Sequence, residues 1–151
     1  PVQENFISYL IRQKLIVAID KEPLLAEGHK KFIIFLPEGE RQELSLLFMH
    51  YLLKSRKNRV VYLGQEISIS DLKDAYDIHK PDFIFTMITE TFAKEPVQTY
   101  VDRLAETFTD CHLLFSGYQV VVQPVVPKEN TSILKSLDQT LSFLDLLDNS
   151  N

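Results

Sequence analysis

One loop of the sequence concentrates acidic residues that could do acid–base chemistry. Residues 37–43 (PEGERQE) follow an apolar stretch and place three carboxylates at the predicted start of a helix. A pair such as Glu38 and Glu40 could transfer protons, but carboxylates at a helix N-terminus also complement the helix dipole, and we favour that role. The same carboxylates would repel a phosphate, and neither GxGxxG nor GxxxxGK occurs here. The loop therefore predicts no nucleotide site.

Histidine and cysteine offer no persuasive metal centre or nucleophile. No histidine has a cysteine or acid at a metal-ligand spacing, so we interpret all four as surface or core-edge residues. Cys111 precedes an apolar strand and is expected to be a buried structural thiol. A lone cysteine makes no internal disulfide, which favours a reducing cytoplasm. The four histidines are His29, His50, His79 and His112.

A phospho-receiver function is also disfavoured. Such a domain needs acidic residues at the end of its first strand and an aspartate at the end of its third. Here the third predicted strand ends in residues 86–89 (TMIT), and Asp82 lies at its opposite end. We therefore predict neither catalytic residues nor a metal site.

Regular alternation of strands and helices predicts the elements that would position a site. Apolar strands separated by amphipathic helices indicate a parallel sheet with right-handed crossovers, covered on both faces. We expect a doubly wound, flavodoxin-like or Rossmann-like sheet of five parallel strands in order 2-1-3-4-5. Ligands of such sheets bind at the carboxyl ends of the strands. The expected strands are 32–36, 60–63, 83–88, 112–115 and 133–134, and the expected helices are 40–57, 70–79 capped by Ser70, 97–109 behind Pro96, and 137–147 capped near Ser136.

A separate helix is predicted before this sheet. Ile7, Ile11, Leu15 and Ala18 recur at helical spacing over residues 3–19, and the helix stops before Pro23. We assign residues 1–23 to the last helix of a cap, 24–31 to a linker and 32–151 to the α/β domain. The apolar face of the helix requires a partner, so we expect an excised fragment of a longer protein that self-associates.

Composition excludes several function classes. The chain has 151 residues, 45% of them hydrophobic and 25% charged, which is ordinary for one globular domain. A net charge of -5 argues against nucleic-acid binding by this segment alone. The basic cluster at residues 54–59 falls at a helix end, where cations suit the dipole. The apolar runs are too short for a membrane span, so no membrane contact is expected.

Two segments carry a resemblance to a known family. Residues 36–47 (LPEGERQELSLL), followed by 60–64 (VVYLG), resemble the cobalamin-binding domains of MerR-family transcriptional regulators, including the light-responsive carotenoid-gene repressors. Residues 3–15 (QENFISYLIRQKL) resemble the last helix of the four-helix cap that precedes that domain. The resemblance implies a DNA-binding winged helix and the rest of the cap upstream, outside this chain.

The motif that grips cobalt is degenerate here. The family's acid-x-His-x-x-Gly reads Glu40-x-Gln42-x-x-Ser45. The acid is kept, but an amide replaces the imidazole that would ligate cobalt, and a carboxamide is a weak donor for that metal. Ser45 replaces the glycine that leaves room for the nucleotide tail.

The remaining family positions are only partly kept. The Glu-His pair of the cap helix reads Glu4-Asn5, again without an imidazole. The hydroxyl motif that ends the third strand survives as Thr86-Met87-Ile88, and the paired glycines after the fourth strand are reduced to Ser116-Gly117. The resemblance therefore implies cobalamin as the family ligand, and we predict no binding with a protein imidazole on cobalt.

We therefore predict an effector-sensing and self-association domain of a MerR-family regulator with a degenerate cobalamin site, and no enzyme activity. It would be a cytoplasmic homo-oligomer that contacts DNA only through the absent winged helix. Two alternatives stay open: a cobalamin-carrying module of a methyltransferase or mutase, and an unrelated flavodoxin-like ligand-binding domain. The cobalamin-carrying enzymes use the missing histidine to control cobalt, which weighs against the first alternative.

Overall fold

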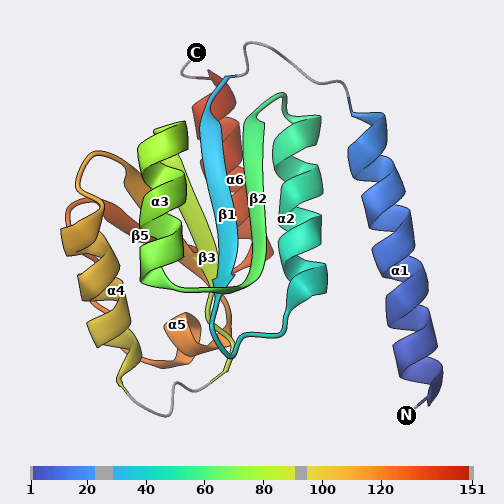
Figure 1. Cartoon of the computed structure of the whole chain (residues 1–151), viewed down its shortest axis with the longest axis horizontal. Coiled ribbons are helices and arrows are strands. Elements are labelled where there is room, and N and C mark those ends of the chain that lie inside the picture. Colours follow the sequence, from blue (N-terminus) through green and yellow to red (C-terminus); the bar gives the residue numbers. More distant parts are fainter. Residues whose placement is uncertain (1, 23–28, 91–94, 150–151) are drawn as a thin grey trace.

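A parallel five-stranded sheet in the order β2-β1-β3-β4-β5 forms the centre of the molecule (Figure 1). The computed structural model describes residues 2–22, 29–90 and 95–149, with only the backbone of residues 2, 3 and 5. Every pairing between neighbouring strands is parallel, so the predicted sheet and strand order are confirmed. The strands are β1 Lys31–Pro37, β2 Arg59–Ile67, β3 Phe83–Met87, β4 His112–Ser116 and β5 Thr131–Ile133.

Helices cover both faces of the sheet. Helices α3 and α4 pack on one face, and α2 and α6 pack on the other (Figure 1). Helix α1 lies outside these layers, alongside α2. The helices are α1 Val2–Lys21, α2 Glu43–Ser55, α3 Ile69–His79, α4 Val97–Thr107, α5 Tyr118–Val122 and α6 Leu137–Asn149.

Strand β1 shows why the sheet needs two helical layers. Its side chains alternate between the faces, and both sets are apolar and fully buried. Phe32 and Ile34 meet α2 and α6, while Ile33 and Phe35 meet α3 and α4. Burying such a side chain stabilises the fold by about 1.5–3 kcal/mol, so the central strand holds both layers in place.

Several element ends differ from the prediction for local reasons. Helix α2 begins at Glu43 instead of residue 40, because Glu40 turns inward to accept hydrogen bonds from Thr89 and Glu90. Helix α3 is capped by Ser68, whose hydroxyl accepts the Asp71 amide hydrogen at 3.1 Å, and not by Ser70. Strand β2 continues to Ile67 past a register shift before Gly64, which has a positive φ of 85°.

The short helix α5 was not predicted. Its run of valines is typical of a strand, because β-branched side chains lower helix propensity. Its position is fixed from outside the helix: Gln119 donates its amide hydrogen to the Ile88 carbonyl at 2.9 Å, and Val120 is buried. Tertiary contacts therefore override the local preference.

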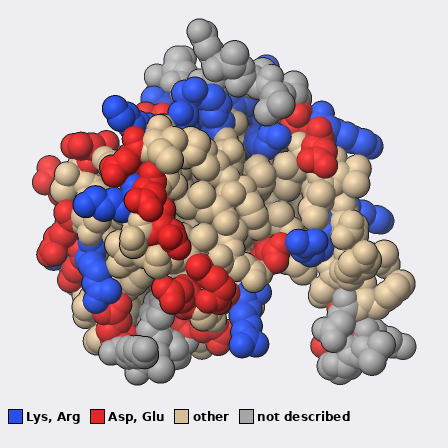
Figure 2. Space-filling model, in the orientation of Figure 1, with Lys and Arg blue, Asp and Glu red and all other residues tan. Residues whose placement is uncertain are grey.

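Helix α1 contacts α2 on one side only. Ile19 is its buried apolar residue, and Arg12 pairs with Glu43 of α2 at 2.8 Å. Ile7 and Ile11, which belong to the predicted apolar face, stay exposed at 55% and 46%. Figure 2 shows a hollow between the lower half of α1 and the rest of the molecule. Among the described residues, none of the helices combines the length and apolarity that a membrane crossing requires.

Two of the four residues of the basic cluster near the end of α2 make side-chain contacts within the fold. Arg56 contacts Asp145 and Asp148 of α6 at 2.6 and 2.9 Å, and Lys54 donates to the Ile19 carbonyl of α1 at 3.2 Å. These contacts tie both neighbouring helices to α2, which agrees with the helix-end interpretation of the cluster.

Gly117 marks a close approach between the loop after β4 and the end of β3. Its φ is 103°, and a Cβ at this position would lie 2.6 Å from the Ile88 carbonyl oxygen. Both the backbone conformation and the space therefore require glycine. Gly39 also has a positive φ, of 91°, but a Cβ there would meet nothing within 4 Å.

These two glycines make a matched pair of substitutions. Gly39→Ala should cost about 1–2 kcal/mol, the strain of a left-handed backbone alone. Gly117→Ala should cost at least about twice as much, because the Cβ also collides with backbone. Urea unfolding of both variants measures the difference, and equal losses would contradict the close approach described here.

Candidate functional site

The buried carboxylate of Glu40 joins two loops at the carboxyl edge of the sheet. It accepts hydrogen bonds from the Thr89 amide at 2.7 Å, the Thr89 hydroxyl at 2.6 Å and the Glu90 amide at 2.8 Å. Its side chain is 1% exposed. These charge-assisted bonds link the loop after β1 to the loop after β3. Glu40 is therefore neither a helix-terminal residue of α2, as we had expected, nor free to act as a base.

This link lies where the chain changes direction across the sheet. From β1 the chain goes to β2 on one side and later returns to β3 on the other. The gap between the two loops is the switch point at which doubly wound sheets bind ligands. Here Glu40 bridges that gap, so the geometry favours a ligand position elsewhere along the same edge.

Three further predicted site residues stabilise the ends of β3 and β4. The Thr86 hydroxyl donates to the Phe35 carbonyl at 2.8 Å, and the Ile88 amide donates to the Ser116 carbonyl at 2.9 Å. Thr86 and Ile88 are both buried. The hydroxyl that the family resemblance assigned to ligand contact is thus engaged with the backbone of β1.

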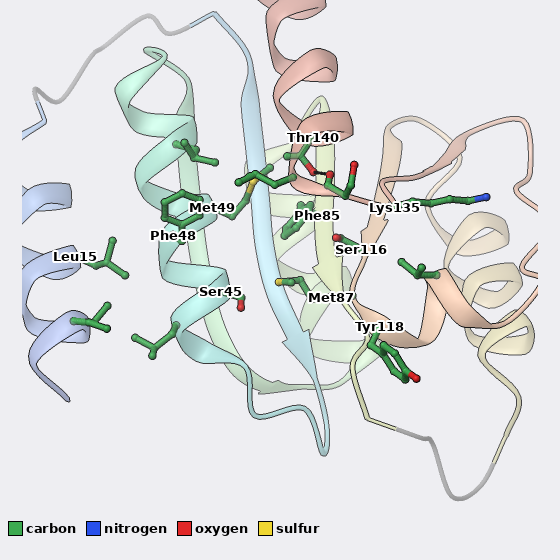
Figure 3. Close-up of a pocket in the computed structure, with 17 residues that line it drawn as sticks. Leu15, Ser45, Phe48, Met49, Phe85, Met87, Ser116, Tyr118, Lys135 and Thr140 are labelled. Carbon is green, nitrogen blue, oxygen red and sulfur yellow. Dashed lines mark hydrogen bonds between the residues drawn. The ribbon is translucent and has the colours of Figure 1, made fainter. Parts of the chain in front are cut away.

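A cavity of about 890 Å³ opens on the face covered by α2 and α6 (Figure 3). Three predicted site residues, Ser45, Ser116 and Gly117, line it. Figure 3 shows Ser45 and Met49 on α2 facing Phe85 and Met87 of β3. The apolar lining includes Ile11 and Leu15 of α1, Phe48 and Met49 of α2, and Phe85 and Met87 of β3.

The other predicted positions lie apart from this cavity. Gln42 is exposed at the N-cap of α2 and makes no side-chain capping bond. Glu4 is exposed on α1, and the side chain of Asn5 lies outside the described residues. The structure therefore distributes the predicted site over a buried loop link, a cavity wall and exposed positions.

Sequence reasoning missed the residues that give the cavity its character. Met49 and Met87 are the only methionines of the chain, and both line the cavity. Phe48 and Phe85 lie on the same helix and strand. The sequence places these residues on a predicted helix and a predicted strand. It does not show that this helix packs against this strand, because the two elements are far apart along the chain.

His50 and Tyr62 form a partly buried aromatic pair between α2 and β2. Their rings stack with centroids 5.1 Å apart. Burial lowers the pKa of His50 to about 4, helped by Lys54 and opposed by Asp20. Burial raises the pKa of Tyr62 to about 12, with a further rise from Glu43. Both groups are neutral near pH 7, which suits packing and not proton transfer.

The described residues contain no group of three or more His, Cys, Asp and Glu side chains placed to hold a metal ion. Cys111 is buried, and burial raises its thiol pKa to about 12. A thiol in this state is a poor nucleophile.

Comparison with known proteins gives a fold but no family. No protein-family model matches the chain, and no curated protein matches it closely enough to count as a relative. One similar solved structure is the methanol:cobalamin methyltransferase complex MtaBC from Methanosarcina barkeri, at 13% identity and a TM-score of 0.62. The match covers 87% of this chain and 51% of that one.

Two other solved structures are similar over smaller regions. A cobalamin-binding protein from Desulfitobacterium hafniense DCB-2 matches at 17% identity and a TM-score of 0.48, over 60% of this chain and 45% of that one. RcsB from Salmonella enterica serovar Typhimurium, bound to promoter rprA with BeF3-, matches at 10% identity and a TM-score of 0.50. That match covers 79% of this chain and 60% of RcsB.

These likenesses show the fold alone. The chain is a doubly wound α/β domain that shares its architecture with part of a cobalamin methyltransferase complex, and it spans about half the length of that structure's chain. The RcsB match shows that the same architecture also occurs in a promoter-bound protein. The choice of function therefore depends on the residues of this chain.

The Glu40 link gives a first prediction for this site. Glu40→Ala should lower the free energy of unfolding by about 2–4 kcal/mol, because two amides and a hydroxyl lose a charged acceptor. Glu38→Ala in the same loop should change it by no more than about 0.5 kcal/mol, because Glu38 is exposed. Denaturant unfolding compares the two variants, and a loss shared equally by both would show that the link is unimportant.

The His50 pair predicts a pH dependence of stability. The folded state holds the His50 pKa near 4, below its ordinary value of 6.5, so the unfolded state binds more protons between these values. Stability should be complete above pH 6.5 and fall as the pH drops towards 4. His50→Phe should reduce this slope while keeping a ring against Tyr62.

The slope should not vanish in that variant, because burial also lowers the pKa of His112. His29→Phe, at an exposed position, is the control for removing a histidine. Thermal unfolding from pH 7.5 to 4 supplies the data, and identical slopes for wild type and His50→Phe would refute the assignment.

Proposed function

We propose that this domain is a non-catalytic small-molecule-binding module that senses an effector, as the regulatory half of a transcriptional regulator would. The cavity at the carboxyl edge is the observation that supports this most strongly. Its volume of about 890 Å³ lies in the range of small-molecule and cofactor sites. Among the described residues no His, Cys, Asp or Glu lines it, so the cavity lacks the carboxylates, imidazoles and thiols from which acid–base pairs and activated nucleophiles are most often built.

Helix α1 gives this module a way to report ligand binding. Ile11 and Leu15 of α1 line the cavity together with residues of the α/β domain, so a ligand there would contact both. Phe6 and Leu10 are 61% and 43% exposed on the same helix and form an apolar surface that a second copy could cover. Ligand binding and self-association would thus act on one helix. DNA contact would come from a winged helix outside this chain, and Cys111 fits a cytoplasmic setting.

A second candidate function is a cobalamin-carrying module. The likeness to the methanol:cobalamin methyltransferase complex favours it, because that match has the highest TM-score of the three structures described above and covers 87% of this chain. Under this proposal the cavity beside Ser45 and Gly117 would accept part of the cobalamin molecule. The residues do not fit cobalt held by a protein imidazole, because Gln42 stands at that position and is exposed.

Titration with hydroxocobalamin and adenosylcobalamin separates the two candidates. A sensor of another effector should show no absorbance change that indicates a protein nitrogen on cobalt, and calorimetry should detect no micromolar binding. Micromolar binding of either cobalamin would support the carrier instead, and it should occur without that spectrum, because Gln42 replaces the imidazole.

A double variant tests the family alignment that underlies both. Gln42→His with Ser45→Gly should raise cobalamin affinity, because it restores the imidazole and clears the tail space. Gln42→His with Ser70→Gly is the matched control, since Ser70 is exposed on α3 across the sheet. No gain from the first variant would argue that residues 40–45 are not equivalent to the family motif.

A further inference from the structure

We propose that the cavity binds a neutral, mainly apolar molecule with one hydroxyl or carbonyl group, held between the methionines Met49 and Met87 and hydrogen-bonded by Ser45 or Ser116. This inference rests on the proposed binding function and names the class of its ligand.

Charge in the cavity argues for a neutral ligand. Lys135 is the single charged residue of the lining, and in Figure 3 its side chain extends away from Met49 and Met87. An anionic group placed between the methionines would lose water without gaining a cation, and a cationic group would find no carboxylate. Burial of an unpaired charge is strongly unfavourable, so a charged body would be excluded from this region.

The apolar surface suits an adaptable fit. Both methionines of the chain face the cavity, and unbranched thioether side chains adjust to irregular apolar shapes. Phe85 is 2% exposed and supplies a flat aromatic wall, while Phe48 is 41% exposed at the rim. A planar or elongated apolar molecule would therefore bury its surface against side chains that can rearrange around it.

Five hydroxyl residues in the described part of the chain line the cavity, and the hydroxyls of Ser45 and Ser116 are open to a polar group of the ligand. Neither makes a side-chain hydrogen bond to another described residue, whereas Thr140 donates to the Ser136 carbonyl and the Ser136 hydroxyl accepts the Gln139 amide hydrogen, both at 3.1 Å. The fifth hydroxyl belongs to Tyr118, which is 64% exposed. A serine hydroxyl both donates and accepts, so it can bind a neutral carbonyl or hydroxyl. The polar part of the ligand is therefore one such group, bound by one of the two serines.

A matched pair of fluorescent probes tests the ligand class on the 151-residue chain. N-phenyl-1-naphthylamine is neutral, and 8-anilino-1-naphthalenesulfonate has the same rings with an added sulfonate. The neutral probe should bind at least about tenfold more tightly. Ser45→Leu, which fills the cavity, should weaken its binding by at least about tenfold, while Ser70→Leu on the opposite face should leave it unchanged.

A second pair of variants protects the test against misfolding. Phe48→Ala removes a rim side chain and should also weaken the neutral probe, whereas Ile78→Ala, at a residue 75% exposed on α3, should not. If Ser45→Leu fails to fold, this pair decides the question. Binding of the neutral probe that is unaffected by Phe48→Ala would place the probe elsewhere and overturn the inference.

Other outcomes separate the failure of this inference from that of the proposed function. Equal or tighter binding of the sulfonate probe, or cobalamin binding without neutral-probe binding, would overturn the ligand class and leave a binding module. Absence of binding by both probes and by cobalamin would count against the binding function as well. Probe binding that disappears as protein concentration rises would show that a second copy fills the cavity, and would also overturn the inference.

Discussion

The carboxylate of Glu40 is the interaction on which the ligand edge of this domain depends. Strands β1 and β3 are parallel neighbours, but the chain adds β2 on one side of β1 and β3 on the other, so the loops after β1 and β3 lead away from each other. Glu40 connects these two loops through three hydrogen bonds to Thr89 and Glu90. Because the side chain turns inward, helix α2 starts only at Glu43, and Gln42 stays on the exposed side of the loop. The acid that the family resemblance assigned to ligand binding is thus engaged in holding the fold together.

The two faces of the sheet differ in how their side chains pack. On the α3 and α4 face, large side chains such as Phe108 and Phe115 are fully buried in the layer. On the α2 and α6 face, small hydroxyl residues, among them Ser45 of α2 and Ser116 of β4, line the cavity between the elements. The cavity follows from this choice of small residues in an otherwise apolar layer. Helix α1 extends that layer outward and places its own apolar residues at the same opening.

Much of the architecture could be predicted because it depends on periodicity along the chain. Alternating strands and helices determine a parallel sheet, and apolar residues on both sides of β1 determine two helical layers. Element ends were less predictable, since they depend on single hydrogen bonds such as the Ser68 cap of α3. The partner face of α1 was also missed: apolar residues occur around the helix, and only its contact with α2 selects Ile19 over Ile7.

The site could be predicted only in fragments for the same physical reason. Ser45, Ser116 and Gly117 were assigned from a family resemblance and line one cavity, but Phe85 and Met87, which face Ser45, lie on a strand that is distant from it in the sequence. No local pattern reports that Glu40 reaches Thr89, 49 positions away.

Amide hydrogen exchange at Thr89 and Glu90, measured by NMR on the intact chain, tests the central role of Glu40 most directly. Both amides lie in a loop, and Glu90 is exposed, so local structure alone would leave them open to solvent. If Glu40 holds the two loops together, these amides exchange slowly, at rates that approach those of the neighbouring strand β3. Exchange as fast as that of the amide of Arg41, in the exposed loop after β1, would contradict the account.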